Sequence, residues 1–348
     1  MPRERTEYVT WDPSRIAKRL HVPTYDEVLE KIKSRYPKRS RYKSRLDAEL
    51  ARLQLVYNII ISKTSFVREL VRVLDSLHPF FWDLIRIEFN EDEIHKAISC
   101  IAKTRRLAGR FWERYRYLLL GAESPRELER LSSEGRGRML SQLKRCSRSL
   151  ETLRSLVVFL SKVPAINPQE KTIIIAGAPS TGKSTFISTA SRAKPRVSPF
   201  PFTTRSIHVG HTVVGDTRIQ LIDTPGLLDR PPEEMNSIEL KAAAALRRIN
   251  GVILLLLDAS PSPALELERQ IGIIETLKRL GAVQKGLYIM INKTDIADPH
   301  AKSKARREAE DLVEAGLAKG YYEGTALSRA DVEGVIRDIA AREGWLAA

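Results

Sequence analysis

Apolar residues in the first half of the chain recur at steps of three and four, which is the spacing of a helix with one buried face. The pattern runs over residues 45–77, returns over 94–118 and returns again over 128–160. Helices of this kind bury their apolar faces against one another. The pattern therefore predicts an antiparallel bundle of three long helices.

Local residues refine this prediction. Thr24 and Glu27 have the spacing of a capping box, and Pro37 would end the short helix that they begin. Gly135 and Gly137 fall inside the third helical pattern, where each glycine costs about 1 kcal/mol relative to alanine. Either the helix breaks there or the backbone makes a close contact with a neighbour.

The second half of the chain follows a different pattern, in which short buried strands alternate with helical segments. Such alternation is typical of a mostly parallel sheet with helices on both faces. The predicted fold class is α plus α/β, with a basic helical bundle over residues 1–165 and an α/β domain over 166–348. The predicted strands occupy residues 171–176, 218–222, 252–257 and 286–291, with a further short strand near Tyr321.

Charge is distributed unevenly between these halves. The 348 residues include 58 Lys and Arg and 43 Asp and Glu, for a net charge of +15. Residues 1–165 hold 34 of the basic and 21 of the acidic residues, so an excess of +13 lies in the helical half. Because excess Lys and Arg neutralise phosphates and release counterions, we expect a polyanionic partner for the bundle.

Two groups of basic residues are candidates for binding phosphate. Arg106, Arg110 and Arg114 are four residues apart and therefore share one face of the second helix. The alternative for each group is a solvated helix surface with i,i+4 salt bridges, which is the more frequent role of a single run of charges. The second group, on the third helix, consists of Arg136, Arg138, Lys144, Arg145 and Arg148.

Composition excludes several classes of protein. With 43% hydrophobic residues the chain is neither fibrous nor wholly disordered. Cys100 and Cys146 are too few for a disulfide framework or a zinc cage, and two thiols suit a reducing compartment, so a cytoplasmic location is expected. The longest strongly apolar run, residues 252–257, is far shorter than the roughly 20 residues of a membrane helix, so no membrane partner is expected.

A phosphate-binding loop follows the first predicted strand. Residues 177–184, GAPSTGKS, match the pattern G-x-x-x-x-G-K-[ST] between a strand and a helix. In this pattern backbone N–H groups surround the phosphates, the lysine contacts the β- and γ-phosphates and the serine hydroxyl binds Mg²⁺. Lys183 is therefore expected to be catalytic and Ser184 to bind the metal. The other residues expected around the nucleotide are Gly177, Ala178, Pro179, Ser180, Thr181, Gly182 and Thr185.

Two further motifs identify the nucleotide as GTP. DTPG follows the second strand, and there Asp223 is expected to reach Mg²⁺ through water while the Gly226 N–H bonds the γ-phosphate. NKTD follows a later strand, and Asp295 can accept from both N1–H and the 2-amino group of guanine, which adenine lacks. Asn292 and Lys293 complete this candidate for guanine binding. Each motif is weak alone, but strand ends of an open α/β sheet form one site.

The remaining candidates lie in weaker motifs. In FPFTTR, residues 200–205, Thr204 is the first choice and Thr203 the second for the residue that closes over Mg²⁺ and the γ-phosphate. Either threonine could instead begin a strand, where threonine is common. A last motif at the end of a short strand could bring backbone N–H groups to the guanine O6; it consists of Thr325, Ala326 and Leu327.

Leu227 follows DTPG, at the position where many GTPases have a glutamine that orients the attacking water. A leucine cannot hold that water. Intrinsic hydrolysis should therefore be slow unless a loop residue, a cation or an activating partner supplies the missing group. This pattern indicates a switch rather than a metabolic enzyme.

Several segments, in order along the chain, resemble the nucleolar GTP-binding protein family, the branch of Obg-type GTPases with a helical domain. The likeness extends from about residue 77 to the end of the chain, and earlier residues match only in general character. The matching segments are HPF (78–80), GRM (137–139), VPAIN (163–167), FPFTTRS (200–206), DTPGLLDRPPEEMNSIE (223–239) and NKTD (292–295).

The resemblance implies a GTP-binding, slowly hydrolysing switch protein that acts in assembly of the large ribosomal subunit. It implies GTP or GDP with Mg²⁺ as cofactors, and the subunit precursor and its rRNA as partners of the helical bundle. Leu227 would be the family's hydrophobic replacement for the glutamine. The residues that match the family's phosphate, Mg²⁺ and guanine motifs are Lys183, Ser184, Thr204, Asp223, Asn292 and Asp295.

Two departures from the family pattern accompany this likeness. Ser180 stands where relatives often have an asparagine that helps to hold a monovalent cation. The chain ends at Ala348, without the long C-terminal extension of eukaryotic members, which points to a compact, archaeal-type form.

Two other functions stay open at this point. A regulatory GTPase could use the bundle to bind a protein partner rather than RNA, although the apolar stripes are expected to be buried inside the bundle. A P-loop kinase with a small-molecule acceptor is disfavoured, because NKTD reads guanine and no acceptor-binding motif is found.

Overall fold

The computed structural model describes residues 12–191, 195–199, 206–223, 235–281 and 286–346. Contacts between residues divide the chain into two compact units. The helical unit comprises residues up to 77 together with 88–161, and the sheet unit comprises 78–87 together with the residues from 162 onward. Both units contain fully buried apolar side chains and therefore a core of their own.

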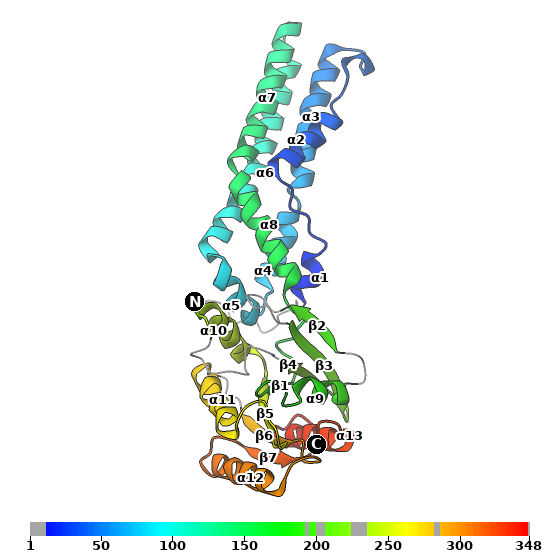
Figure 1. Ribbon diagram of the computed structural model, residues 1–348. Helices are drawn as coiled ribbons and strands as arrows, with labels where there is room; N and C mark the ends of the chain where they lie inside the picture. The colour runs from blue at the N-terminus through cyan, green and yellow to red at the C-terminus, as the bar shows by residue number, and fades with distance from the viewer. Residues whose placement is uncertain (1–11, 192–194, 200–205, 224–234, 282–285, 347–348) are drawn as a thin grey trace. The chain divides into compact units, whose positions relative to one another are not determined.

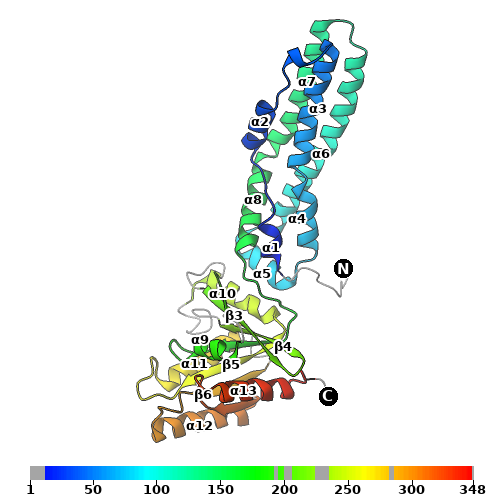
Figure 2. The ribbon, with the colours of Figure 1, turned by 90° about the vertical axis from the view of Figure 1, so that its right-hand side faces the viewer.

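Three helices form the centre of the helical unit (Figures 1 and 2). They lie side by side because each has an apolar stripe that the other two cover. Leu53, Ile94, Ile101 and Met139 on these stripes are fully buried. The three helices are α3 (Arg45–Lys63), α6 (Glu91–Leu120) and α7 (Pro125–Arg145).

Shorter helices complete this unit. One of them has the N-cap half of the predicted capping box, because the Thr24 Oγ1 accepts a hydrogen bond from the Glu27 N–H at 3.1 Å. The Glu27 carboxylate instead lies 2.9 Å from the His21 Nε2. This helix ends at Ser34, shortly before Pro37. The short elements are α1 (Pro13–Ala17), α2 (Tyr25–Ser34), the 3₁₀ turn η1 (Arg39–Arg41), α4 (Phe66–Asp75) and α8 (Ser147–Lys162).

Two of the three long helices predicted from the sequence are interrupted. The first divides into α3 and α4 at Thr64, whose hydroxyl donates to the Ile60 carbonyl at 2.6 Å and whose backbone leaves the helical conformation. The third divides into α7 and α8 at Cys146, where φ is −95° and ψ is 13°. Apolar spacing continues across both breaks, so periodicity alone does not reveal them.

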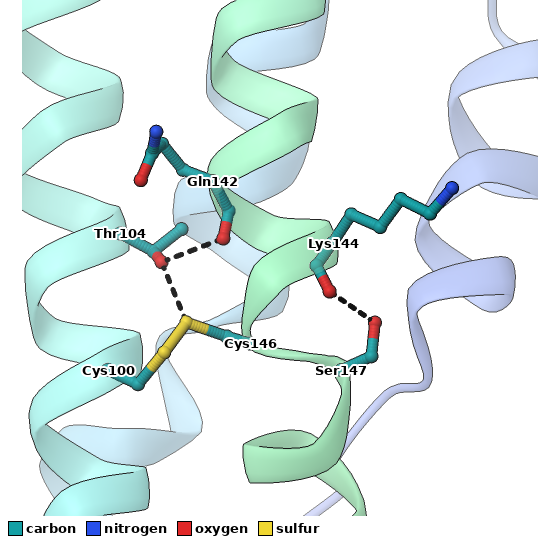
Figure 3. Close-up of a disulfide and its surroundings, with 6 residues drawn as sticks. All are labelled: Cys100, Thr104, Gln142, Lys144, Cys146 and Ser147. Carbon is teal, nitrogen blue, oxygen red and sulfur yellow. Dashed lines mark hydrogen bonds between the residues drawn. A yellow bond between two sulfur atoms is a disulfide. The ribbon is translucent and has the colours of Figure 1, made fainter.

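The two cysteines are joined by a disulfide, which corrects the expectation of two thiols (Figure 3). Cys100 lies on α6 and Cys146 between α7 and α8, and their Cα atoms are 6.0 Å apart. The Thr104 Oγ1 lies 3.3 Å from the Cys146 Sγ. A separation of 46 residues hides this pairing in the sequence, because only the packing of α6 against α7 brings the two together. The inference of a reducing compartment from free thiols therefore loses its basis.

α7 passes through both of its glycines without a break, and the two have different surroundings. At Gly135 a Cβ would lie 2.7 Å from the Tyr115 Cγ and 2.9 Å from the Leu53 Cδ1. At Gly137 no described atom outside the local helix backbone lies within 4 Å of that position. The close-contact alternative is thus confirmed for Gly135, where a missing side chain lets α7 approach α6 and α3.

The sheet unit is built on one mixed sheet. Within the described residues its seven strands have the order β2-β3-β4-β1-β5-β6-β7. β1 is central and pairs in parallel with β4 and β5, while β2 and β3 add an antiparallel edge. The strands are β1 (Thr172–Ala176), β2 (Arg196–Pro199), β3 (Ser206–Val214), β4 (Thr217–Asp223), β5 (Gly251–Asp258), β6 (Leu287–Asn292) and β7 (Gly320–Glu323).

Helices cover both faces of this sheet, as the alternating pattern predicts (Figures 1 and 2). α9 and α13 share a core with one face, in which Phe186 and Ile336 pack with Ile173. α11 packs on β5, and α12 on β6 and β7. No helix in the described part of the chain is long and apolar enough to cross a bilayer. The helices of this unit are α5 (Pro79–Glu88), α9 (Lys183–Ala190), α10 (Ser237–Ala245), the 3₁₀ turn η3 (Leu246–Arg248), α11 (Leu267–Arg279), α12 (Pro299–Glu314) and α13 (Arg329–Arg342).

The two glycines of α7 give opposite predictions for alanine substitution. Gly137→Ala should stabilise the chain by about 1 kcal/mol, because alanine favours a helix and has room there. Gly135→Ala should destabilise it by about 1–3 kcal/mol, because the added methyl group collides with Tyr115 and Leu53. Urea unfolding followed by circular dichroism would compare the two free energies. Equal stabilisation by both variants would contradict the close packing at Gly135.

Reduction of the disulfide should weaken the helical unit. For a closed loop of 46 residues, the chain-entropy model predicts a loss of about 4 kcal/mol in the free energy of unfolding. Thermal unfolding with and without dithiothreitol measures this loss, and Cys100→Ser serves as the control that dithiothreitol should not affect. An unchanged transition, together with two free thiols by mass spectrometry of the untreated protein, would count against the bond.

Candidate functional site

The phosphate-loop motif connects the central strand β1 to α9. Gly177 has φ 142° and Gly182 has φ 96°, values that residues with a side chain rarely adopt. A Cβ at Gly177 would lie 2.6 Å from the Leu256 carbonyl oxygen, and one at Gly182 would collide with the Asn292 Nδ2. Both glycines are therefore required by the backbone path. Ser180 also adopts a positive φ, 65°, although it is not a glycine.

The ammonium group of Lys183 is buried within the phosphate loop. Lys183 is 7% exposed, and its ammonium group donates hydrogen bonds of 2.8 Å to the carbonyls of Gly177 and Ala178. The Thr181 hydroxyl donates to the same Ala178 carbonyl at 2.9 Å. The loop thus curls around a buried cation, which is the arrangement that attracts an anion. The other predicted residues of the loop differ in exposure: Pro179, Ser180 and Ser184 are exposed, and Thr185 is half-buried.

Ser184 and Asp223 meet at the carboxyl ends of β1 and β4. The Ser184 hydroxyl donates to the Asp223 Oδ2 at 2.6 Å. Asp223 is fully buried, and its Oδ1 has no hydrogen-bond partner among the described residues. The His208 Nδ1, on the paired strand β3, lies 3.4 Å from the Oδ2. A buried carboxylate with an unused oxygen beside a hydroxyl is a donor set that fits Mg²⁺.

Asn292 joins three of the predicted motifs. It is 1% exposed at the end of β6. Its Nδ2 donates to the Thr181 carbonyl in the phosphate loop at 2.6 Å, and its Oδ1 accepts from the Ala326 N–H at 2.7 Å. One buried amide therefore holds the phosphate loop, NKTD and the segment 325–327 together.

The rest of the candidate guanine site surrounds this amide. Lys293 adopts φ 61°, and its ammonium group lies 2.7 Å from the Asp258 Oδ2. Asp295 is exposed, which leaves its carboxylate accessible to a base.

The segment 325–327 offers fewer donors than the sequence led us to expect. The Thr325 N–H donates to the Asp331 Oδ2 at 2.9 Å, and the Ala326 N–H donates to Asn292. The Leu327 N–H makes only a long contact of 3.4 Å with the Thr325 Oγ1, and its side chain is 74% exposed. Leu327 is thus the residue of this segment whose N–H is least engaged.

Four predicted residues lie outside the described part of the chain. Thr203, Thr204, Gly226 and Leu227 belong to the ranges 200–205 and 224–234. Their roles therefore stay predictions from the sequence.

Three residues beside the site were missed by the sequence analysis. Asp258 had a signal, since it is an acid at the end of a fully apolar strand. His208 had none, because its place opposite Asp223 depends on the antiparallel pairing of β3 with β4. Asp331 likewise reaches Thr325 only through the position of α13.

Most of the basic residues singled out in the helical unit are exposed. Arg106, Arg110 and Arg114 are all exposed on α6. None of the three forms an ion pair with another described residue, so their charges face solvent. Three residues of the second group are also exposed: Lys144, Arg145 and Arg148.

Arg136 and Arg138 differ from the other candidates because both form ion pairs within the helical unit, and Arg136 is half-buried while Arg138 is exposed. Arg136 pairs with the buried Glu49 at 3.0 Å, and its guanidinium lies 5.7 Å from the centre of the Tyr36 ring. Arg138 donates twice to Glu134. Hydrogen bonds from Tyr115 and from Arg138 hold the pKa of Glu134 below its usual range, so that pair stays charged. Arg138 therefore has the i,i+4 salt bridge of the alternative, whereas Arg136 pairs across helices with a residue of α3.

Comparisons with known protein families match the helical unit and the sheet unit separately. The model of the NOG1 N-terminal helical domain matches residues 18–167, and the model of the 50S ribosome-binding GTPase matches residues 172–293. Nucleolar GTP-binding protein 1 of Drosophila melanogaster is 38% identical over 234 residues, which are 67% of this chain and 36% of that protein. The Arabidopsis thaliana protein of the same name is 32% identical over 283 residues, 79% of this chain and 42% of that protein.

A solved structure from Plasmodium falciparum, described as a nucleolar GTP-binding protein 1, is 33% identical. It covers 51% of this chain and 89% of its own, with a TM-score of 0.44. The chain spans less than half the length of the two curated relatives. The two family models together match residues 18–167 and 172–293, and the motifs found in the sequence lie within or beside these ranges. The chain belongs to the nucleolar GTP-binding protein family.

Proposed function

We propose that this chain binds GTP with Mg²⁺ and hydrolyses it slowly, as a switch in assembly of the large ribosomal subunit. The observation that carries the proposal is the buried Asn292 amide, which links the phosphate loop to NKTD and to Ala326. These motifs lie at the carboxyl ends of parallel strands, where open α/β sheets bind their ligands. The matched family of 50S ribosome-binding GTPases supports the ribosomal role.

The chemistry follows from charge placement rather than from a covalent step. Ser184 and Asp223 would hold Mg²⁺, which neutralises phosphate charge when bound. Lys183 would exchange its two loop carbonyls for the β- and γ-phosphates. Thr204 and the Gly226 N–H would contact the γ-phosphate, as their motifs indicate. Because Leu227 cannot orient water, the unassisted rate is low and an activating partner would raise it.

Guanine recognition would use the carboxylate of Asp295. It is exposed in the turn that follows Asn292, and a carboxylate accepts from both N1–H and the 2-amino group of guanine. Lys293 and the N–H of Leu327 would complete the surroundings of the base.

The helical unit would contact rRNA through its exposed arginines. Arg106, Arg110 and Arg114 form a row of cations without ion-pair partners among the described residues, on the face of α6 opposite the buried Ile101 and Ala108. Such a row suits the evenly spaced charges of a nucleic-acid backbone. The precursor of the large subunit is the proposed partner.

One observation favours the second candidate, a protein partner for the bundle. Tyr117 is 79% exposed and Leu120 is 56% exposed at the end of α6, close to the row of arginines. Exposed aromatic side chains are frequent at protein interfaces. The bundle would then bind protein while the sheet unit kept its nucleotide chemistry.

The proposed location follows the partner. The names of the matched relatives refer to the nucleolus, which hardly fits the cytoplasmic location expected from the sequence. We propose that the protein works inside the cell wherever large-subunit precursors are assembled.

Asp295→Asn should weaken GTP binding and alter base preference. Loss of the charge on an acceptor of two hydrogen bonds should raise the Kd for GTP about 10- to 100-fold. Affinity for XTP should rise, because the asparagine amide can donate to the 2-oxo group of xanthine. Asp298→Asn is the matched control, since Asp298 caps α12 only three residues away. Fluorescence titration measures the affinities of both variants for GTP and XTP. An unchanged GTP affinity of Asp295→Asn would exclude Asp295 from guanine recognition.

Reversal of the three arginines should weaken binding to large-subunit particles. With Arg106, Arg110 and Arg114 changed to Glu, the logarithmic salt dependence of binding should flatten by roughly two to three units. Co-sedimentation with purified subunits across a salt series, with GDP or a non-hydrolysable GTP analogue, measures this slope.

The matched control makes the same charge change on the sheet unit. It replaces Arg247, Lys278 and Arg307, all exposed, with Glu. An equal effect of both triple variants would show that only net charge matters. Absence of binding by the unmodified chain at low salt, in every nucleotide state, would favour the protein-partner alternative.

A further inference from the structure

The end of β5 holds a charged side chain that none of the predicted motifs contains. Asp258 is the last residue of β5, and its register partner on β6 is Asn292, the first residue of NKTD. Its side chain is only 2% exposed. A buried carboxylate is strongly unfavourable unless cations and hydrogen-bond donors compensate it, so its partners indicate its role.

Asp258 is fixed from both sides. Its Oδ1 accepts from the Ser260 N–H at 2.9 Å, and its Oδ2 accepts from the Lys293 Nζ at 2.7 Å. Its own N–H donates to the Gln270 Oε1 at 2.7 Å, and its carbonyl accepts from the Gln270 Nε2 at 3.3 Å. Gln270 is itself fully buried on α11. Asp258 is therefore a fixed point from which a charge-assisted hydrogen bond reaches Lys293.

Lys293 needs such a fixed point because its backbone is strained. Its φ of 61° lies in the left-handed region, which costs a residue with a side chain roughly 1–3 kcal/mol and persists only where the surroundings hold it. The Ile296 N–H donates to the Lys293 carbonyl at 3.1 Å, so residues 293–296 form one turn. Asp295 is part of that turn, and a change in the backbone at Lys293 would move its carboxylate.

We infer that Asp258 is a positioning residue for guanine recognition. By holding the Lys293 ammonium group, it keeps the turn 293–296 in the conformation that presents Asp295. The inference rests on the proposed function, because it assigns a supporting residue to the guanine site proposed above. Asp258 itself contacts no base in this scheme.

The test measures dissociation constants for GDP and for IDP, which lacks the 2-amino group that Asp295 would bind. Asp258→Asn keeps the size of the side chain and removes its charge, and it should raise the Kd for GDP about tenfold. It should also narrow the preference for GDP over IDP, because a displaced Asp295 loses the 2-amino contact. A general structural defect would weaken both ligands equally and leave that preference unchanged, which would overturn the inference.

Two comparisons show whether Asp258 acts through Lys293. Lys293→Met should weaken GDP binding to a similar extent, and the double variant should be no weaker than either single one, because both changes break the same pair. A further tenfold loss in the double variant would overturn the inference. Glu268→Gln is the control, since it removes the Lys304 ion pair on the surface and should leave both constants unchanged.

The inference can still be tested if the Asp258→Asn variant does not fold. If Asp258→Asn alone does not fold, the double variant has no uncompensated cation and can be compared with Lys293→Met. Equal dissociation constants of the double variant and Lys293→Met for GDP support the inference. Weaker GDP binding by the double variant overturns it. If the unmodified chain binds neither GDP nor GTP, the proposed function itself fails. Guanine binding by the unmodified chain with an unchanged Asp258→Asn variant overturns the positioning role alone.

Discussion

The sheet unit depends on one buried side-chain amide. Asn292 is buried, and its side-chain amide donates a hydrogen bond to the phosphate loop and accepts one from the Ala326 N–H. Gly182 must be a glycine because this amide occupies the place of a side chain. The phosphate loop, NKTD and the segment 325–327, each a weak signal in the sequence, are therefore joined by hydrogen bonds in the fold. The two hydrogen bonds of this amide connect the phosphate loop directly with the segment 325–327.

A second constraint shapes the helical unit. Gly135 lets α7 lie against the side chains of Tyr115 and Leu53. On the same helix, Arg136 pairs with the buried Glu49 of α3, which Arg52 also neutralises. The basic character of this half thus has two sources. Some arginines stabilise the packing of helices, and others, such as those on the outer face of α6, remain available to a partner.

Much of the architecture could be predicted from the sequence because its signals are local. Buried strands, helix periodicity and the glycines of the phosphate loop all act within a few residues. Features that depend on distant contacts could not be predicted: the disulfide between Cys100 and Cys146, the pairing of Arg136 with Glu49 and the position of His208 beside Asp223. The breaks at Thr64 and Cys146 were missed for a different reason, since apolar spacing continues through them.

The assignment of α5 to the sheet unit has a consequence for synthesis of the chain. Asp83 on α5 pairs with Arg248, which follows it by 165 residues. Phe80, Phe81 and Leu84 of α5 are fully buried in the finished fold. At typical translation speeds, roughly 10–30 seconds pass between emergence of the two partners. During that interval the ion pair between α5 and the segment after α10 cannot form, so α5 completes its contacts with the sheet unit late in synthesis.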